Sequence, residues 1–111
     1  MQFIAKSRYV SCSPYKLRPF ADVIRGKKAV YARDWLFAYR SARSRLLKKV
    51  LDTAIANAKH LRQVDEKNLV VKTIMIDGGP IQRYFKPGAQ GRAQPQARRM
   101  SHIQIVLESI E

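Results

Sequence analysis

The stretch "FKPGAQGRAQPQARRMSH", residues 85–102, separates two apolar segments and decides what kind of fold they can build. It belongs to a longer region, residues 78–101, that holds four of the chain's five glycines and three of its five prolines. A compact domain seldom carries so long an irregular loop unless the loop is functional or disordered. Two flanking strands that pair antiparallel can instead continue outward as a twisted ribbon, and about 10 residues a side at about 3.3 Å each would reach about 30 Å. The sequence therefore predicts an extended hairpin arm over residues 78–101.

Three segments have the patterns of strands. "LVVKTIMI", residues 69–76, is largely apolar on both faces, which favours a strand in the centre of its sheet. "HIQIVLESI", residues 102–110, alternates between apolar and polar residues and is expected to be half-buried. "QFIAKSRYV", residues 2–10, is short and rich in β-branched and aromatic residues, which indicates a third strand.

A first helix is expected to begin after "SCSP", with Ser13 as the capping residue and Pro14 at the first helical position. Gly26 is a plausible stop for this helix. Pro19 conflicts with it, because a proline inside a helix removes a backbone hydrogen bond and should kink it.

Two further helices are expected between the first helix and the second strand. Residues 29–39 are apolar enough for a short helix in which Trp35 and Phe37 act as core anchors. Residues 41–61 carry the strongest helical pattern of the chain. Its apolar stripe consists of Leu47, Val50, Leu51, Ala54, Ile55, Ala58 and Leu61.

The charge of the chain limits its function. The 111 residues suit a single domain, residues 1–111, and include 22 Lys and Arg against 8 Asp and Glu, a net charge of +14. So much like charge repels itself in a compact fold, so a polyanion is the expected partner: nucleic acid first, an anionic membrane surface second.

No apolar run is long enough to span a bilayer, and the N-terminus lacks the apolar segment of a signal peptide. The lone Cys12 excludes an internal disulfide, so an intracellular protein is expected.

The basic residues concentrate in two places. The arm carries Arg83, Lys86, Arg92, Arg98 and Arg99, and no acidic residue occurs between Asp77 and Glu108. With Tyr84 and Phe85 beside them, these residues suit an element that follows phosphates, stacks on bases and becomes ordered on its partner. The first half of the 41–61 helix carries Arg43, Arg45, Lys48 and Lys49, at the end where the helix dipole disfavours cations. This placement favours an anionic partner over a merely solvated face.

Catalytic chemistry has little support. Asp77 and His102 flank the arm and could be imagined as an acid–base pair, but a turn residue and a strand-end imidazole explain them better. The sequence shows no His, Cys and carboxylate cluster with metal spacing and no phosphate-loop glycine motif. No enzyme activity, metal or cofactor is therefore expected.

At this point the residues resemble a known family. "PGAQGRA" followed by "RRMSHIQIVL" resembles the C-terminal signature of the ribosomal protein L22 family, and "IAK", "KLRPFADVIRGKK" and "VLDTAIANAKH" occur upstream in the expected order. The compact length resembles the bacterial or organellar form. The resemblance implies an α+β fold in which three helices pack on a small antiparallel β-sheet with a long protruding β-hairpin.

The resemblance also implies a function and partners. The protein would be a structural constituent of the large ribosomal subunit that binds large-subunit rRNA and supports subunit assembly. Its arm would line the nascent-peptide exit tunnel, where changes affect macrolide sensitivity. Its partners would be large-subunit rRNA, neighbouring large-subunit proteins and the nascent polypeptide, with no membrane and no cofactor. It would lie in the cytoplasmic ribosome or in an organellar one.

Residues can be carried over one by one. The tip motif of the family reads Pro-Arg-Ala-x-Gly-Arg-Ala; here Gly88 replaces its first arginine and Gln90 is neutral where some relatives have lysine. Pro19 and Arg33 stand at usually aliphatic positions, and Arg33 suggests an extra phosphate contact or a thinner core. The predicted tunnel tip is Pro87, Gly88, Ala89, Gln90, Gly91 and Arg92. The predicted rRNA-binding residues are Lys6, Arg8, Lys16, Arg18, Arg25, Lys27, Lys28, Arg43, Arg45, Arg83, Lys86, Arg92, Arg98 and Arg99.

Two other classes remain as alternatives. A basic nucleic-acid-binding module outside the ribosome, such as a chromatin-type or antimicrobial polycation, would show little preference between RNA and duplex DNA. A small nuclease or transferase would depend on Asp77 and His102.

Overall fold

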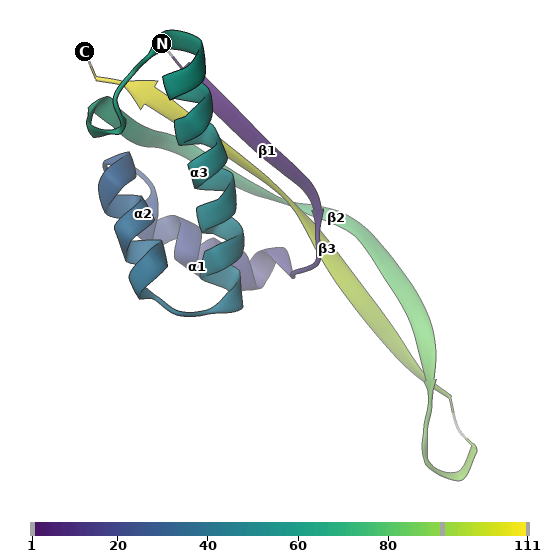
Figure 1. Ribbon diagram of the computed structural model, residues 1–111. Helices are drawn as coiled ribbons and strands as arrows, with labels where there is room; N and C mark the ends of the chain where they lie inside the picture. The colour runs from purple at the N-terminus through teal and green to yellow at the C-terminus, as the bar shows by residue number, and fades with distance from the viewer. Residues whose placement is uncertain (1, 92, 111) are drawn as a thin grey trace.

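The computed structural model describes residues 2–91 and 93–110, apart from the side chains of Gln82, Tyr84, Phe85, Lys86 and Gln94. The described elements are, in chain order, β1 (Gln2–Val10), α1 (Pro14–Ile24), α2 (Ala29–Ala38), α3 (Ala42–Arg62), the 3₁₀ helix η1 (Glu66–Asn68), β2 (Leu69–Pro87), the 3₁₀ turn η2 (Ala89–Gly91) and β3 (Ala93–Ser109). Three α-helices and a three-stranded antiparallel sheet make an α+β fold, which confirms the expected class. Figure 1 shows the helices grouped beside the sheet, with both chain ends far from the hairpin.

The sheet has the strand order β1–β3–β2, so β3 is the central strand. The prediction that residues 69–76 form the central strand is wrong. A shift of register between Val71 and Thr73 explains the misleading pattern. Leu69 and Val71 are buried before this bulge and Ile74 and Ile76 after it. Because the extra residue switches which positions face inward, apolar residues of both parities serve one buried face.

The expected hairpin is formed by the outer parts of β2 and β3. Their pairing continues beyond the sheet as a two-stranded ribbon, as far as Pro87 opposite Ala93. At the tip, Gln90 and Gly91 adopt left-handed conformations with φ of 59° and 74°, which turn the chain back. The ribbon gives the molecule extents of 64 × 24 × 18 Å, and Figure 1 shows it projecting from the body.

The hydrophobic core lies between the helices and one face of the sheet. Alternate strand residues such as Phe3 and Ala5 point into it, as do Ile103, Ile105 and Leu107 of β3. No described residue from 78 to 100 is buried. The described residues of the arm therefore take no part in the core and contribute no hydrophobic burial to the body.

Two expected core residues lie at the surface instead. Phe37 is 74% exposed, and its ring lies 5.9 Å from the Lys48 Nζ, whereas Trp35 is half-buried against the core as expected. Leu61 is 67% exposed because it belongs to the last turn of α3, next to the left-handed Gln63 where the chain leaves the helix. The other six residues of the predicted stripe are buried.

The helix ends follow the sequence only in part. Pro14 is the first residue of α1, and Gly26 follows its end with a φ of 79°. The helix continues through Pro19 to Ile24. Ser13 occupies the capping position, but its side chain makes no capping hydrogen bond, so that expectation is wrong. Ser41 does cap α3: its Oγ accepts from the Ser44 N–H at 3.2 Å, and its own N–H donates to the Ser44 Oγ.

Candidate nucleic-acid interface

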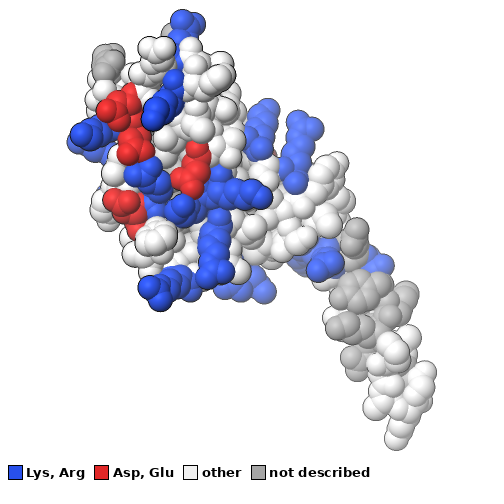
Figure 2. Space-filling view, viewed as in Figure 1, with Lys and Arg blue, Asp and Glu red and all other residues white. Residues whose placement is uncertain are grey.

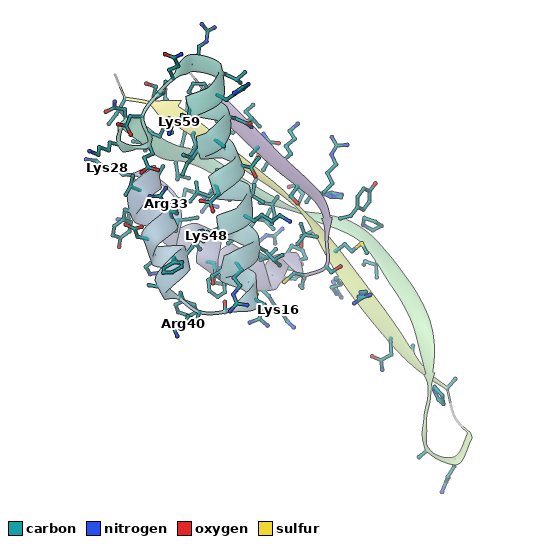
Figure 3. The ribbon with its side chains drawn as sticks, in the orientation of Figure 1. Lys16, Lys28, Arg33, Arg40, Lys48 and Lys59 are labelled. Carbon is teal, nitrogen blue, oxygen red and sulfur yellow. The ribbon has the colours of Figure 1, made fainter. Side chains whose placement is uncertain are left out.

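Four of the predicted RNA-binding residues meet at the base of the arm. A hollow of about 740 Å³ lies where the first residues of α1 and α3 face the base of β3. We call it the basal hollow; Lys16, Arg43, Arg98 and Arg99 line it, and none of its lining residues is acidic. Figure 3 labels Lys16, at the end of the helical layer where α1 and α3 begin. Segments far apart in sequence thus bring four positive charges to one concave surface.

The helix dipoles add to this positive potential. The segments Ser11–Lys16 and Ser41–Leu46, which include the starts of α1 and α3, both contribute to the wall. The N-terminal end of a helix carries a partial positive charge and unpaired N–H groups, which favour anions. The four cationic side chains are exposed, so they can reach a ligand. The arrangement is suited to bind the phosphates of a polyanion.

Two buried serines fix the walls of the basal hollow. The Ser101 hydroxyl donates to the Cys12 carbonyl at 2.5 Å and so holds the start of α1 against β3. The Ser44 hydroxyl donates to the carbonyls of Tyr39 and Ser41, which sets the start of α3. Sequence reasoning missed both residues. The sequence pattern could have indicated that Ser101 is buried, because it lies two and four residues before Ile103 and Ile105, on the same inward-facing side of the strand.

A second hollow, of about 280 Å³, lies on the face of the sheet away from the helices. We call it the outer-face hollow; it is lined by Lys6, Arg8, Tyr9, Asp77, His102, Ile103 and Gln104. It brings together Lys6 and Arg8, both predicted to bind RNA. It also contains Asp77 and His102, the acid–base pair that an enzyme would need. The Nδ1 of His102 accepts the Tyr9 N–H at 3.1 Å, which gives this imidazole a structural role.

Two predicted RNA-binding arginines hold the fold together instead of pointing freely outward. The Nη2 of Arg18 donates to the Ile76 carbonyl at 3.1 Å, and the Nη2 of Arg25 donates to the Ile74 carbonyl at 3.2 Å. Because β2 is an edge strand, these bonds satisfy carbonyls that its sheet leaves unpaired. The Lys27 carbonyl accepts the Val71 N–H of the same strand, and the Gly26 N–H donates to the Val71 carbonyl, both at 2.9 Å. The side chains of Lys27 and Lys28 are exposed.

The remaining predicted residues that the structure describes lie on α3 and on the arm. Arg45 is exposed on α3 and Arg83 is exposed on the arm. Of the predicted tip, Pro87, Ala89, Gln90 and Gly91 are exposed and Gly88 is half-buried. Arg92 and the side chains of Tyr84, Phe85 and Lys86 lie outside the described residues. On the face shown in Figure 2, acidic side chains gather on the part of the body away from the arm, and basic ones reach the arm's base.

Arg33, whose position suggested an extra phosphate contact or a thinner core, makes an ion pair with Glu66 within the chain. Its guanidinium donates to both carboxylate oxygens of Glu66, one of them at 3.3 Å from Nη2. The hydrogen bond to Glu66 raises the pKa of Arg33, and the same bond lowers the pKa of Glu66 below its ordinary 4.5. The pair ties α2 to η1, and Figure 3 labels Arg33 on α2.

This ion pair predicts a pH dependence of stability. Since the pKa of Glu66 is lower in the folded than in the unfolded state, the stabilisation is fully present above pH 4.5 and is lost as the pH falls through the lowered folded value. Both side chains are partly exposed, so Glu66→Gln should lower the free energy of unfolding by at most about 1 kcal/mol at pH 7. Urea denaturation of both proteins between pH 7 and about pH 3 should show this difference shrinking. A difference that stays constant or grows as the pH falls would contradict it. Arg33→Gln combined with Glu66→Gln is the control, because the second change should then add little.

Two kinds of feature are absent from the described part of the chain. No group of three or more His, Cys, Asp or Glu side chains there is arranged to hold a metal ion. None of the described helices has both the length and the apolar character that crossing a membrane requires.

Comparisons with known proteins cover body and arm alike. The family model described as "Ribosomal protein L22p/L17e" matches residues 5–108. The large ribosomal subunit protein uL22 of Opitutus terrae is 40% identical over 107 residues, which cover 96% of this chain and 95% of that protein. The proteins of the same name from Syntrophomonas wolfei and Syntrophus aciditrophicus are each 42% identical, over 111 and 108 residues, and are each covered to 98% of their length.

Proposed function

Because the chain belongs to the ribosomal protein L22 family, a family of large-subunit structural proteins, we propose that it binds large-subunit rRNA as a structural component of that subunit. The body and the arm would share this contact, and neighbouring large-subunit proteins would complete it. The subunit would belong to a cytoplasmic or organellar ribosome. The family is not one of enzymes, which agrees with a His102 engaged by the backbone.

The basal hollow is the observation that carries the proposal. Four cations from three segments of the chain line one concavity, and nothing acidic among its lining residues offsets them. Their mutual repulsion makes the unbound arrangement costly, and the phosphates of an RNA strand would relieve it. Contacts of this kind recognise backbone and shape more than base sequence, as is usual for structural RNA binding.

We assign the arm to the nascent-peptide exit tunnel and its tip, residues 87–92, to the tunnel wall. The ribbon projects from the body, and none of its residues whose burial the structure describes, from 78 to 100, is buried. Both facts support this assignment, because such an element can enter a narrow space without disturbing the body. The predicted arm cations Arg83, Lys86 and Arg92 would follow the surrounding rRNA. The tip would carry less charge than is usual in the family, since Gly88 and Gln90 are neutral.

The salt dependence of binding tests the proposal. A plot of the logarithm of the affinity for the cognate rRNA against the logarithm of the salt concentration should have a slope of about −6 if about 8 phosphates are neutralised. Fluorescence anisotropy with a labelled rRNA fragment, titrated at several salt concentrations, gives this slope. A slope shallower than about −2 would contradict the proposal. Duplex DNA of equal length is the control: equal affinity for both would favour the non-ribosomal basic module.

A further inference from the structure

Tyr9 adopts a backbone conformation that tyrosine seldom takes. Its φ is 58°, in the left-handed region, and it lies at the irregularity where the β1–β3 register shifts between Ser7 and Val10. A bulky residue there costs free energy that glycine would avoid, and such strain often marks a functional position. The bulge accompanies the turn of the chain from β1 toward α1. That turn does not require a tyrosine at this position.

His102 contacts both the backbone and the ring of Tyr9. The Tyr9 N–H donates to the Nδ1 of His102 at 3.1 Å, and the Tyr9 ring stands at 90° to the His102 ring with centroids 5.1 Å apart. Even so, the Tyr9 residue is 62% exposed. A ring that is braced on one side and open on another can stack on a planar ligand with little loss of side-chain freedom.

The outer-face hollow around Tyr9 differs in chemistry from the basal hollow. Lys6 and Arg8 supply positive charge from β1, but Asp77 and Gln104 also line it. A carboxylate there repels phosphate, whereas it accepts hydrogen bonds from amino groups. At about 280 Å³ the hollow is small, which suits a single planar ring system better than a duplex.

We propose that the outer-face hollow binds one unpaired nucleobase of RNA, stacked on Tyr9. Lys6 and Arg8 hold the flanking phosphates, and Asp77 and Gln104 face the hydrogen-bonding edge of the base. The site rests on the proposed function, in that the ligand is RNA, but it adds a base-reading contact to binding that otherwise depends on phosphates and shape. Unpaired bases stacked on aromatic side chains are the usual means by which proteins read RNA sequence.

The test compares the affinity of the chain for two RNA probes of equal charge, one with a base at its centre and one without. The probes are a short single-stranded oligoribonucleotide with a central adenine and the same oligonucleotide with that nucleotide abasic. The full chain should bind the adenine probe at least about fivefold more tightly, the lower range of one base–aromatic stack. Tyr9→Phe should keep this preference because it keeps the ring. Tyr9→Gly should lose it, and glycine suits the φ of 58°, so the fold is retained.

Replacing the central adenine by unsubstituted purine tests the polar edge. Wild type should prefer adenine severalfold, because a charged acceptor faces the amino group, and Asp77→Ala should abolish this preference. The subsite is overturned if wild type binds adenine and abasic probes equally, or if Tyr9→Gly keeps the preference of wild type. Either result would leave unchanged the dependence of the affinity for the cognate rRNA on salt concentration, which tests the proposed function. A shallow slope would instead reject the proposed function, so the two failures are distinguishable.

Discussion

Replacing Lys16, Arg43, Arg98 and Arg99 together by glutamine is expected to weaken binding to large-subunit rRNA by roughly a hundredfold at about 0.15 M salt. These are the cations of the basal hollow. Each lost phosphate contact reduces the log–log salt slope by about 0.7, so four contacts reduce it by about 3 units. All four side chains are exposed, so the free energy of unfolding should change little. Fluorescence anisotropy at several salt concentrations measures both the affinity and the slope.

A matched control removes the same number of charges elsewhere. Lys49, Lys59, Arg62 and Lys67 are exposed on α3 and η1, and none of them lines the basal hollow. Their replacement by glutamine should cost far less affinity, because a general field falls off within about 10 Å at moderate salt. Equal losses in the two variants would show that binding depends on net charge alone, and the basal hollow would lose its special role.

Removing the arm should separate RNA binding from folding. Gln82 and Arg98 are paired across the ribbon, so residues 83–97 can be replaced by an Asn-Gly turn that joins them. No described residue in that segment is buried, so the free energy of unfolding should stay within about 0.5 kcal/mol of wild type. Affinity for the rRNA should fall by about fiftyfold, since the contacts of Arg83, Lys86 and Arg92 are lost. Urea denaturation and anisotropy measure the two quantities.

The control for the arm keeps its length and removes only its charge. Arg83→Gln, Lys86→Gln and Arg92→Gln in the full chain should reproduce most of the lost affinity if phosphate contacts dominate. If the charge variant binds like wild type while the shortened chain does not, shape and stacking carry the arm's contribution. A shortened chain that unfolds, or one that binds rRNA unchanged, would contradict the assignment of the arm as an independent binding element.

Local sequence patterns predicted the helices and strands well where residues close in sequence determine which side chains are buried. The alternation of residues 102–110 and the apolar stripe from Leu47 to Ala58 gave a strand and a helix with the expected buried faces. The errors lie where a distant segment decides. Residues 69–76 form an edge strand because a bulge redirects their side chains. Phe37 lies at the surface beside Lys48, and Arg33 pairs with a glutamate far along the chain.

By itself the sequence determined the class of partner and the existence of the arm, because net charge and the placement of glycine, proline and apolar residues are properties of the chain. Only the tertiary structure decided which cations lie close together in space. Lys16, Arg43 and Arg99 are separated by tens of positions, and nothing local distinguishes them from Arg18 or Arg25. Packing of α1 and α3 against the base of β3, held by the buried hydroxyls of Ser44 and Ser101, directs the first group into one hollow. The same packing turns Arg18 and Arg25 onto edge carbonyls of β2. Electrostatic attraction depends on distance in space, and only the folded chain sets that distance.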